Sequence, residues 1–196
     1  MAHYFTDNSS LDSDPVSFDY YLGNEKFVFT SDRGVFSKGK IDYGSYVLIK
    51  NVVTRSLGTE ILDLGCGYGP IGIILKRFHE DANVTLVDVN PRATELAERN
   101  AAENHEDVTV FVEEDITRLG ITFDTVVLNP PIRAGKETVF SLYRKAHETL
   151  REGGDLYIVI RKKQGAESSR KYLETFFTEV QVLDHDGGYL VMKALK

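Results

Sequence analysis

The chain has 196 residues, a length typical of one domain, and its 42% hydrophobic content is enough for a sizeable core. Its net charge of −7 argues against a non-specific nucleic-acid binder. No apolar run is long enough to span a membrane, and Met1–Asp7 lacks the features of a signal peptide. A single cysteine and five scattered histidines exclude an internal disulfide and give no metal-ligand spacing, so we expect a cytoplasmic protein without a bound metal.

The charge is unevenly distributed. Residues 1–32 carry six acids against one base, whereas residues 133–171 carry ten bases against five acids. The second region is therefore able to face a polyanion although the whole chain is acidic. A solvated helix surface explains the same pattern equally well.

The N-terminal part predicts a β-hairpin. Two aromatic runs, 20–22 and 27–29, flank a glycine-containing turn at 23–26. A flexible, partly basic loop follows at 34–40, and Asp42 is a good N-cap for a helix over 43–53. We expect residues 1–35 to form a hairpin extension of the same domain that residues 36–196 build.

From residue 60 the pattern alternates between short apolar strands and amphipathic helices. The predicted strands are 60–64, 84–88, 108–112, 123–128 and 155–160, and the predicted helices are 69–78, 91–104, 136–150 and 168–177. Two further strands, 179–183 and 188–192, are joined by a turn at 184–187 with no helix between them. The alternation predicts an α/β fold, a mostly parallel sheet covered by helices on both faces, with one antiparallel strand at the end.

The first motif is Asp63-Leu64-Gly65-Cys66-Gly67-Tyr68-Gly69, where a strand ends and a helix begins. Glycines let the backbone approach a ligand, and the helix N-terminus offers free N–H groups, so the loop is typical of a nucleoside-cofactor site. The run Gly67-x-Gly69-x-x-Gly72 also fits the dinucleotide fingerprint, which leaves a nicotinamide oxidoreductase open.

Two acids follow at the ends of the next two predicted strands. Asp88 stands nineteen residues after Gly69, where a carboxylate can accept hydrogen bonds from ribose hydroxyls. Asp115 is positioned to accept from an adenine amino group, with Ile116 packing on the ring. We interpret Cys66 as a small buried residue of the loop rather than a nucleophile, because no histidine lies near it in the sequence.

The second motif is Asn129-Pro130-Pro131-Ile132, directly after an apolar strand. The prolines fix φ and remove two backbone donors, so we expect the Pro130 carbonyl to have little local competition and to point into a cleft. The Asn129 side-chain oxygen is a second acceptor. Together they are suited to hold both N–H bonds of an NH₂ group and to aim its lone pair at a methyl donor. No histidine is placed for hydride transfer, which disfavours the nicotinamide alternative.

These motifs, with Gly34-Val35-Phe36-Ser37 and Asp42-Tyr43-Gly44-Ser45, resemble those of class I S-adenosylmethionine-dependent methyltransferases of the Asn-Pro-Pro type, and more narrowly the small-subunit ribosomal RNA guanine-N2 methyltransferases. The resemblance implies a Rossmann-like seven-stranded fold, S-adenosylmethionine as cofactor with S-adenosylhomocysteine as product, and small-subunit rRNA as partner. Longer members carry an extra N-terminal domain, so RNA recognition here is expected from the hairpin and the basic loops.

The expected site has three groups of residues. The catalytic residues are Asn129, Pro130 and Pro131. The cofactor-binding residues are Asp63, Gly65, Cys66, Gly67, Gly69, Asp88, Val89, Asp115, Ile116 and Asn129. The substrate-binding residues are Phe36, Lys38, Lys40, Ile132, Arg133 and Lys136. Many relatives carry a stacking aromatic at the position of Ile132; Phe36 is the candidate to replace it, with aliphatic packing by Ile132 and a core position of Phe36 as the alternatives.

Other substrates and functions stay open. The same turn serves methylation of adenine in nucleic acid and of a glutamine side chain in a protein. A non-catalytic RNA-binding module on the same fold is the alternative of a different class. We expect a monomer or a weak homodimer without membrane contact.

Overall fold

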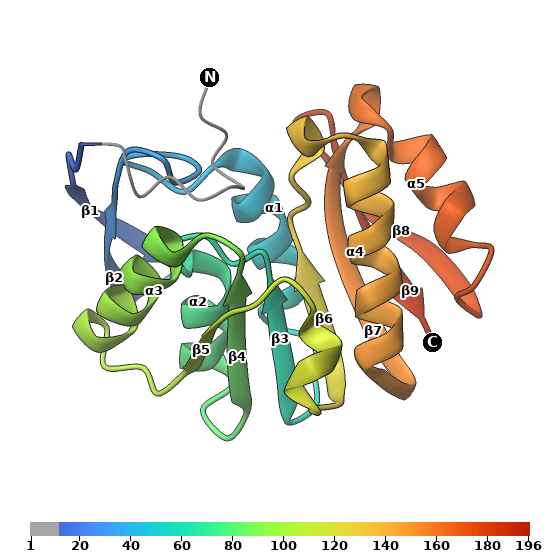
Figure 1. The fold of residues 1–196 in the computed structure, drawn as a ribbon, viewed down its shortest axis with the longest axis horizontal. Coiled ribbons are helices and arrows are strands. Elements are labelled where there is room, and N and C mark those ends of the chain that lie inside the picture. The colour runs from blue at the N-terminus through green and yellow to red at the C-terminus, as the bar shows by residue number, and fades with distance from the viewer. Residues whose placement is uncertain (1–11) are drawn as a thin grey trace.

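A computed structural model of the chain describes residues 12–196, so the interpretation of Met1–Asp7 lies outside the described residues. A seven-stranded sheet in the order β5-β4-β3-β6-β7-β9-β8 forms the centre of the molecule (Figure 1). Its strands are β3 (Glu60–Leu64), β4 (Asn83–Asp88), β5 (Thr109–Val112), β6 (Phe123–Leu128), β7 (Leu150–Arg161), β8 (Glu179–Asp186) and β9 (Tyr189–Leu195).

The pairing of the strands confirms the predicted fold class. Strands β3 to β7 pair in parallel, whereas β9 runs antiparallel to both β7 and β8. The turn between β8 and β9 is shorter than the predicted 184–187, because only Gly187 and Gly188 remain unpaired. Both glycines have positive φ, 54° and 82°, as a tight two-residue hairpin turn requires.

Strand β7 begins five residues earlier than predicted, at Leu150 rather than 155. Leu150 is buried and pairs with Phe123, and the register between β6 and β7 shifts before Thr125 pairs with Asp155. The irregular pairing allows the polar sequence Arg151-Glu152-Gly153-Gly154 to lie in an extended strand that its composition does not predict.

Helices cover both faces of the sheet (Figure 1). Side chains of β3 alternate between the two resulting cores: Ile61 belongs to the core that α1, α2 and α3 cover, and Leu62 to the core that α4 covers. The helices are α1 (Tyr43–Val52), α2 (Pro70–Phe78), α3 (Pro91–Glu103), α4 (Lys136–Thr149) and α5 (Ala166–Leu173), with short 3₁₀ helices η1 (Ile116–Leu119), η2 (Ile132–Ala134) and η3 (Lys162–Gln164). In the described part of the chain, no helix is long and apolar enough to cross a membrane.

The predicted hairpin forms a separate two-stranded sheet of β1 (Val16–Leu22) and β2 (Glu25–Ser31). Its turn contains only Gly23 and Asn24, because Leu22 pairs with Glu25. Phe27 and Phe29 are fully buried in the core beneath α1, α2 and α3. The hairpin is therefore packed against the main body.

Two asparagines of α3 attach β2 to the rest of the fold. Asn104 bonds both the N–H and the C=O of Val28, at 2.9 and 2.8 Å. Asn100 bonds both groups of Thr30, at 2.7 and 2.9 Å, and also donates to the carbonyl of Tyr68. Asn100 and Asn104 are four residues apart, a rise of about 6 Å in a helix, and Val28 and Thr30 are two residues apart, a rise of about 6.7 Å in a strand. Because the two spacings match, the side-chain amides form the hydrogen bonds that a neighbouring strand would otherwise form with β2.

Replacing Asn100 by Ala should lower the free energy of unfolding by about 2–4 kcal/mol, because buried backbone groups of Thr30 and Tyr68 lose their partners. Urea unfolding measures the change. Glu98→Ala, at an exposed position of the same helix, serves as control and should stay within about 0.5 kcal/mol of the wild type. An equal effect of both substitutions would contradict the proposed attachment.

Candidate active site

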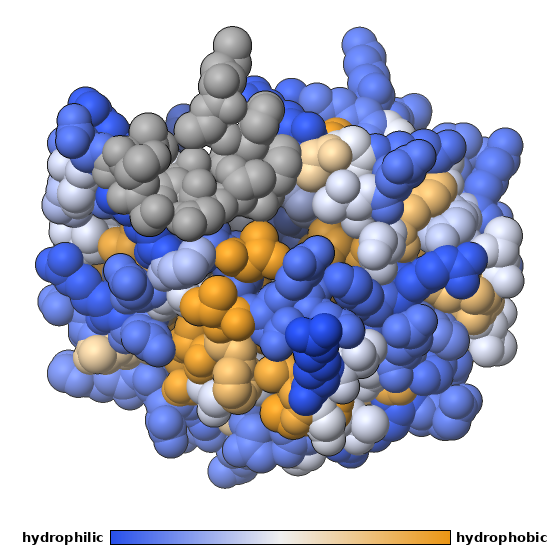
Figure 2. Space-filling model, viewed as in Figure 1, coloured by the Kyte–Doolittle hydropathy of each residue, from blue (hydrophilic) through white to orange (hydrophobic). Residues whose placement is uncertain are grey.

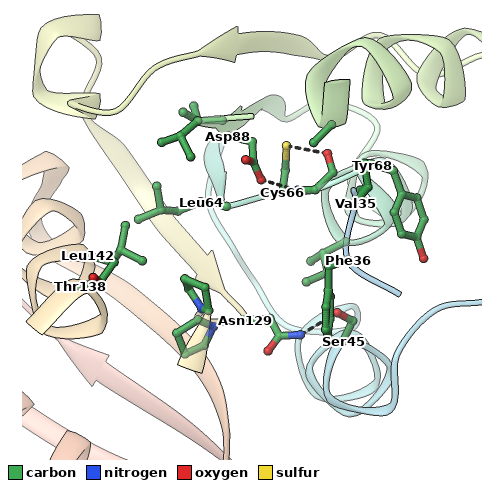
Figure 3. A pocket seen from close by; sticks show the side chains of 18 of the residues that line it. Val35, Phe36, Ser45, Leu64, Cys66, Tyr68, Asp88, Asn129, Thr138 and Leu142 are labelled. Atoms are coloured by element: carbon green, nitrogen blue, oxygen red, sulfur yellow. Dashed lines mark hydrogen bonds between the residues drawn. The ribbon is translucent and has the colours of Figure 1, made fainter. Parts of the chain in front are cut away.

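A cavity of about 690 Å³ lies at the carboxyl ends of β3, β4 and β6, a size suited to a cofactor or small substrate. Its walls come from the glycine loop, the ends of β4 and β5, the Asn129-Pro130-Pro131 turn and α4 (Figure 3). Figure 2 shows hydrophobic surface gathered in the middle of the face seen in Figure 1, surrounded by hydrophilic surface. Open parallel sheets bind ligands at this edge, so the two predicted motifs meet where a ligand is expected.

The glycines of the loop have different roles. Gly65, Gly67 and Gly69 all have positive φ, at 71°, 58° and 89°. A Cβ atom built on Gly65 or Gly67 would meet nothing within 4 Å, so the backbone there borders open space. A Cβ on Gly69 would approach Ile73, Leu86 and Ala97 to 2.9–3.1 Å, so Gly69 instead permits close packing. The open cradle at Gly65 and Gly67 fits a ligand that contacts the backbone directly.

Two carboxylates lie beside this cradle: Asp63 is buried behind the cavity lining, and the half-buried Asp88 lines the cavity. Asp63 is 1% exposed; its Oδ2 accepts a hydrogen bond from Gly72 N at 2.8 Å, and its Oδ1 has no partner among the described residues. Burial raises the pKa of Asp63 to about 7, and the nearby Asp88 adds to the rise, while the Gly72 N–H opposes it. An unsatisfied buried carboxylate oxygen favours a ligand that brings a donor, such as an ammonium group.

Asp88 supports the loop as well as lining the cavity. Its Oδ2 accepts from Gly67 N and its Oδ1 from Asn90 N, both at 2.9 Å. Burial raises the pKa of Asp88, although these backbone donors oppose the shift. Burial and the two carboxylates raise the pKa of the Cys66 thiol, which keeps it protonated and supports its interpretation as a packing residue.

Asp115 and Ile116 do not lie where the sequence interpretation put them. The Asp115 carboxylate caps η1 through Thr117 N and Oγ1, at 3.3 and 2.7 Å, and Ile116 is fully buried in the core beneath α4. Neither residue lines the cavity; Glu113, Glu114 and the exposed Val89 do. Strand β5 ends at Val112 as predicted, and the residues that line the cavity follow it directly, two positions before Asp115.

The carboxamide of Asn129 is held from one side. Its Nδ2 donates to Ser45 Oγ at 2.9 Å and lies 3.3 and 3.4 Å from the two carboxylate oxygens of Asp42. An ionised carboxylate only accepts hydrogen bonds, so the amide must turn its nitrogen toward Asp42. Asn129 Oδ1 accepts no hydrogen bond from the described residues and is turned away from Ser45 (Figure 3).

The turn after Asn129 differs from the expectation in one respect. The Pro130 carbonyl accepts a hydrogen bond from Ile132 N at 2.9 Å, so it is not free of local competition. Pro131, at φ −74° and ψ 79°, closes an inverse γ-turn that brings this N–H back to the carbonyl. A carbonyl oxygen has a second lone pair, which leaves Pro130 able to accept one further hydrogen bond.

Of the expected substrate-binding residues, only Phe36 lines the cavity, with 39% of its surface exposed. Lys38 pairs with Asp14, and Ile132 packs against the core beneath α4. Arg133, Lys136 and Lys40 are exposed outside the cavity lining, and Lys136 lies over the ring of Phe140. Their contact with a substrate stays a prediction.

The sequence interpretation missed several contributors to the site. Asp42 was recognised only as a helix cap, and nothing in the sequence connected it or Ser45 to Asn129, which is more than eighty residues away. Thr138 and Leu142 of α4 also line the cavity. Residues 12–196 contain no group of three or more His, Cys, Asp or Glu that could hold a metal ion.

Known proteins are similar to this chain in sequence and in fold. The model of the methyltransferase small domain family matches residues 26–193. The uncharacterized protein YbxB of Bacillus subtilis is 41% identical, covering 99% of this chain and 98% of its own length. A ribosomal RNA small subunit methyltransferase C of Haemophilus influenzae is 30% identical over 85% of this chain, but the match covers 51% of that protein.

Among solved structures, a T. Thermophilus 16S rRNA N2 methyltransferase (RsmC), in complex with AdoMet and guanosine, superposes with a TM-score of 0.83 at 25% identity. The superposition covers 93% of this chain and 50% of that chain, so the chain spans about half the length of these two rRNA methyltransferases. The seven-stranded sheet is thus a Rossmann-like methyltransferase fold. With a family model matching most of its length, the chain belongs to the methyltransferase small domain family.

Proposed function

We propose that this protein transfers the methyl group of S-adenosylmethionine to an exocyclic amino nitrogen, N2 of a guanine in small-subunit ribosomal RNA. Methyl transfer is the activity for which its family is named. The guanine target is supported by relatives named as small-subunit rRNA methyltransferases and by the guanosine in the T. Thermophilus complex. A cytoplasmic location follows from this substrate.

The orientation of Asn129 carries the proposal. Because Asp42 and Ser45 occupy its amide nitrogen, the amide oxygen is the group left for a ligand in the cavity. The second lone pair of the Pro130 carbonyl lies one residue further along the same turn. Two neutral acceptors of this kind suit an NH₂ group, which has two protons to donate.

Residues of the glycine loop and of the end of β4 would hold the cofactor. Gly65 and Gly67, which line the cavity, would hold the methionine portion, and Asp88 the ribose. Asp63 lies behind this lining with an unpartnered Oδ1, which would accept from an ammonium group that reaches it. When bound, S-adenosylmethionine supplies an electrophilic methyl group on a sulfonium that is a good leaving group. The adenine contact remains open between the predicted Asp115 and Ile116 and the cavity-lining Glu113, Glu114 and Val89.

The chain's own contribution is to position the amine. A base that reacts at N2 must first leave its stack to enter the cavity. Asn129 and Pro130 would then accept its two N–H bonds and direct the nitrogen lone pair into the cavity. Alignment of two reactants supplies about 7–11 kcal/mol of rate enhancement in favourable cases, so no strong base is required.

Replacing Asn129 by Ala should reduce kcat/KM for methyl transfer by on the order of 100-fold or more, because one acceptor for the amine is lost. The affinity for S-adenosylmethionine should change less than about twofold, as calorimetric titration would show. Assays with small ribosomal subunits, protein-free rRNA and ribosomal proteins, followed by nucleoside analysis, identify the acceptor. Full activity of the variant would overturn the role of Asn129, and label in protein or in adenine would overturn the guanine target.

Asp42 and Ser45 should act as positioning residues. Asp42→Ser keeps a good helix cap but removes the carboxylate that faces Asn129, and Ser45→Ala removes the 2.9 Å hydrogen bond. Each should lower kcat about tenfold with little change in cofactor affinity, because the amide of Asn129 is free to turn. In the Asn129→Ala background neither should lower activity further; additive losses would contradict the positioning role.

The affinity for S-adenosylmethionine should depend on pH through Asp63. A cationic amine favours the ionised carboxylate, whose pKa of about 7 in the free protein means that binding at lower pH requires loss of a proton. The Kd should therefore be roughly fivefold to tenfold higher at about pH 6 than at about pH 7.5. The Asp63→Asn variant should bind S-adenosylmethionine more weakly and with a Kd that does not depend on pH. A wild-type Kd that is independent of pH would contradict the role of Asp63.

A further inference from the structure

Three tyrosines form a cluster beside the cavity that the proposed chemistry does not use. Tyr43 and Tyr46 lie one turn apart on α1, with ring centroids 5.7 Å apart, and Tyr189 at the start of β9 lies 5.8 Å from Tyr43. Tyr43 is 45% exposed and Tyr46 37%, whereas most large aromatic side chains of a folded protein are more deeply buried. We call these residues, together with Arg161, the tyrosine platform.

The platform adjoins Asn129 through a single glycine. A Cβ built on Gly44 would lie 2.9 Å from Tyr189 Cε1 and 3.5 Å from Asn129 Nδ2. Only a residue without a side chain leaves room for both groups. The edge of the Tyr189 ring and the amide of Asn129 therefore lie on either side of Gly44. A nucleotide stacked on the platform would be adjacent to a base bound at Asn129.

The platform is held rigid by its surroundings. The turn at Gly187 packs so closely on Tyr43 that a Cβ there would approach the ring to 2.4 Å. The Tyr43 hydroxyl donates to Asp186 at 2.6 Å, and the guanidinium of Arg161 lies 4.9 Å from the Tyr189 ring while its Nε donates to the Tyr189 hydroxyl at 2.7 Å. The rings are thus fixed while part of their surface stays exposed, which lowers the entropy cost of stacking a ligand on them.

The charge around the platform is positive on the side of β7. Arg161, Lys162 and Lys163 are consecutive and exposed, and Lys162 N donates to the carbonyl of Gly188 beside Tyr189 at 2.9 Å. Neither lysine forms an ion pair with any residue in the range 12–196. Lys50 pairs with Asp186 at 2.9 Å and lies 3.9 Å from Asp184, so it offsets one of these two nearby negative charges. Aromatic faces beside unpaired cations are the features by which proteins bind single-stranded nucleic acid.

We propose that the platform of Tyr43, Tyr46, Tyr189 and Arg161 stacks an unpaired RNA nucleotide next to the target base, and that Lys162 and Lys163 bind its phosphates. This inference rests on the proposed RNA substrate. It gives the base-stacking surface that Ile132, an aliphatic residue packed into the core, does not provide. It also assigns a role to part of the basic region 133–171 of an otherwise acidic chain.

Binding of a short fluorescent single-stranded RNA, measured by anisotropy with S-adenosylhomocysteine present, tests the platform. Tyr46→Ala should raise the Kd about tenfold, whereas Tyr46→Phe, which keeps the ring, should stay within about twofold of wild type. Phe78→Ala is the matched control, because Phe78 is also an exposed aromatic beside basic residues but lies at the C-terminal end of α2, outside the cavity lining. Combined Lys162→Ala and Lys163→Ala should reduce the slope of log Kd against log salt by about 1.4.

Kinetics separate this inference from the proposed function. With RNA as substrate, Tyr46→Ala should raise KM while kcat at saturating RNA and the melting temperature stay near wild type. Unchanged RNA affinity in Tyr46→Ala, with a wild type that methylates guanine in RNA, would overturn the platform and leave the proposed function intact. If the wild type binds RNA through the platform but transfers no methyl group to RNA, only the proposed function is overturned. If the wild type does not bind RNA, the platform and the proposed function are both overturned.

Discussion

The carboxylate of Asp42 connects the start of α1 to the end of β6. It accepts hydrogen bonds from the backbone N–H groups of Gly44 and Ser45 and from the amide nitrogen of Asn129. Since a carboxylate offers no donor, the group that begins the helix also decides that the oxygen of Asn129 is left for a ligand. The cavity therefore depends on the packing of α1, whose residues Val47, Leu48 and Ile49 are fully buried in the core.

The two sides of the cavity offer a ligand different acceptor groups. At the glycine loop, burial raises the pKa of both Asp63 and Asp88, and Asp88 adds to the rise at Asp63, so a cation bound there would stabilise the ionised carboxylates. At the opposite wall, Asn129 and Pro130 offer neutral oxygens. A neutral acceptor binds an uncharged amine without attracting a proton to it, so the nitrogen keeps the lone pair that methyl transfer needs. Because the Asp42 carboxylate on this side accepts from the amide nitrogen of Asn129, the amide oxygen is left for the neutral amine, while the carboxylates at the glycine loop suit the cationic donor.

Much of the fold could be predicted because the central strands β3, β4 and β6 are short apolar runs buried on both faces. In addition, helices carry local start signals such as Asp42 and Asn90. The differences arise where the position of an element depends on its neighbour. Leu150 joins β7 only because Phe123 pairs with it across a register shift. Likewise, Glu113 and Glu114 line the cavity in place of Asp115 and Ile116, although the end of β5 at Val112 was predicted, because the chain turns into η1, which Asp115 caps and in which Ile116 is buried.

Contacts across long sequence separations could not be predicted for a different reason. As a helix cap, Asp42 already had a sufficient local explanation, so no feature of the sequence indicated its contact with Asn129. Gly44 is similar: its neighbours in space, Tyr189 and Asn129, follow it by 145 and 85 residues. A side chain at this position would approach the Tyr189 ring to 2.9 Å and the Asp42 carboxylate, which holds the Asn129 amide, to 3.0 Å. One short segment at the start of α1 therefore couples the holding of the amine to the proposed stacking of RNA, and a change there affects both together.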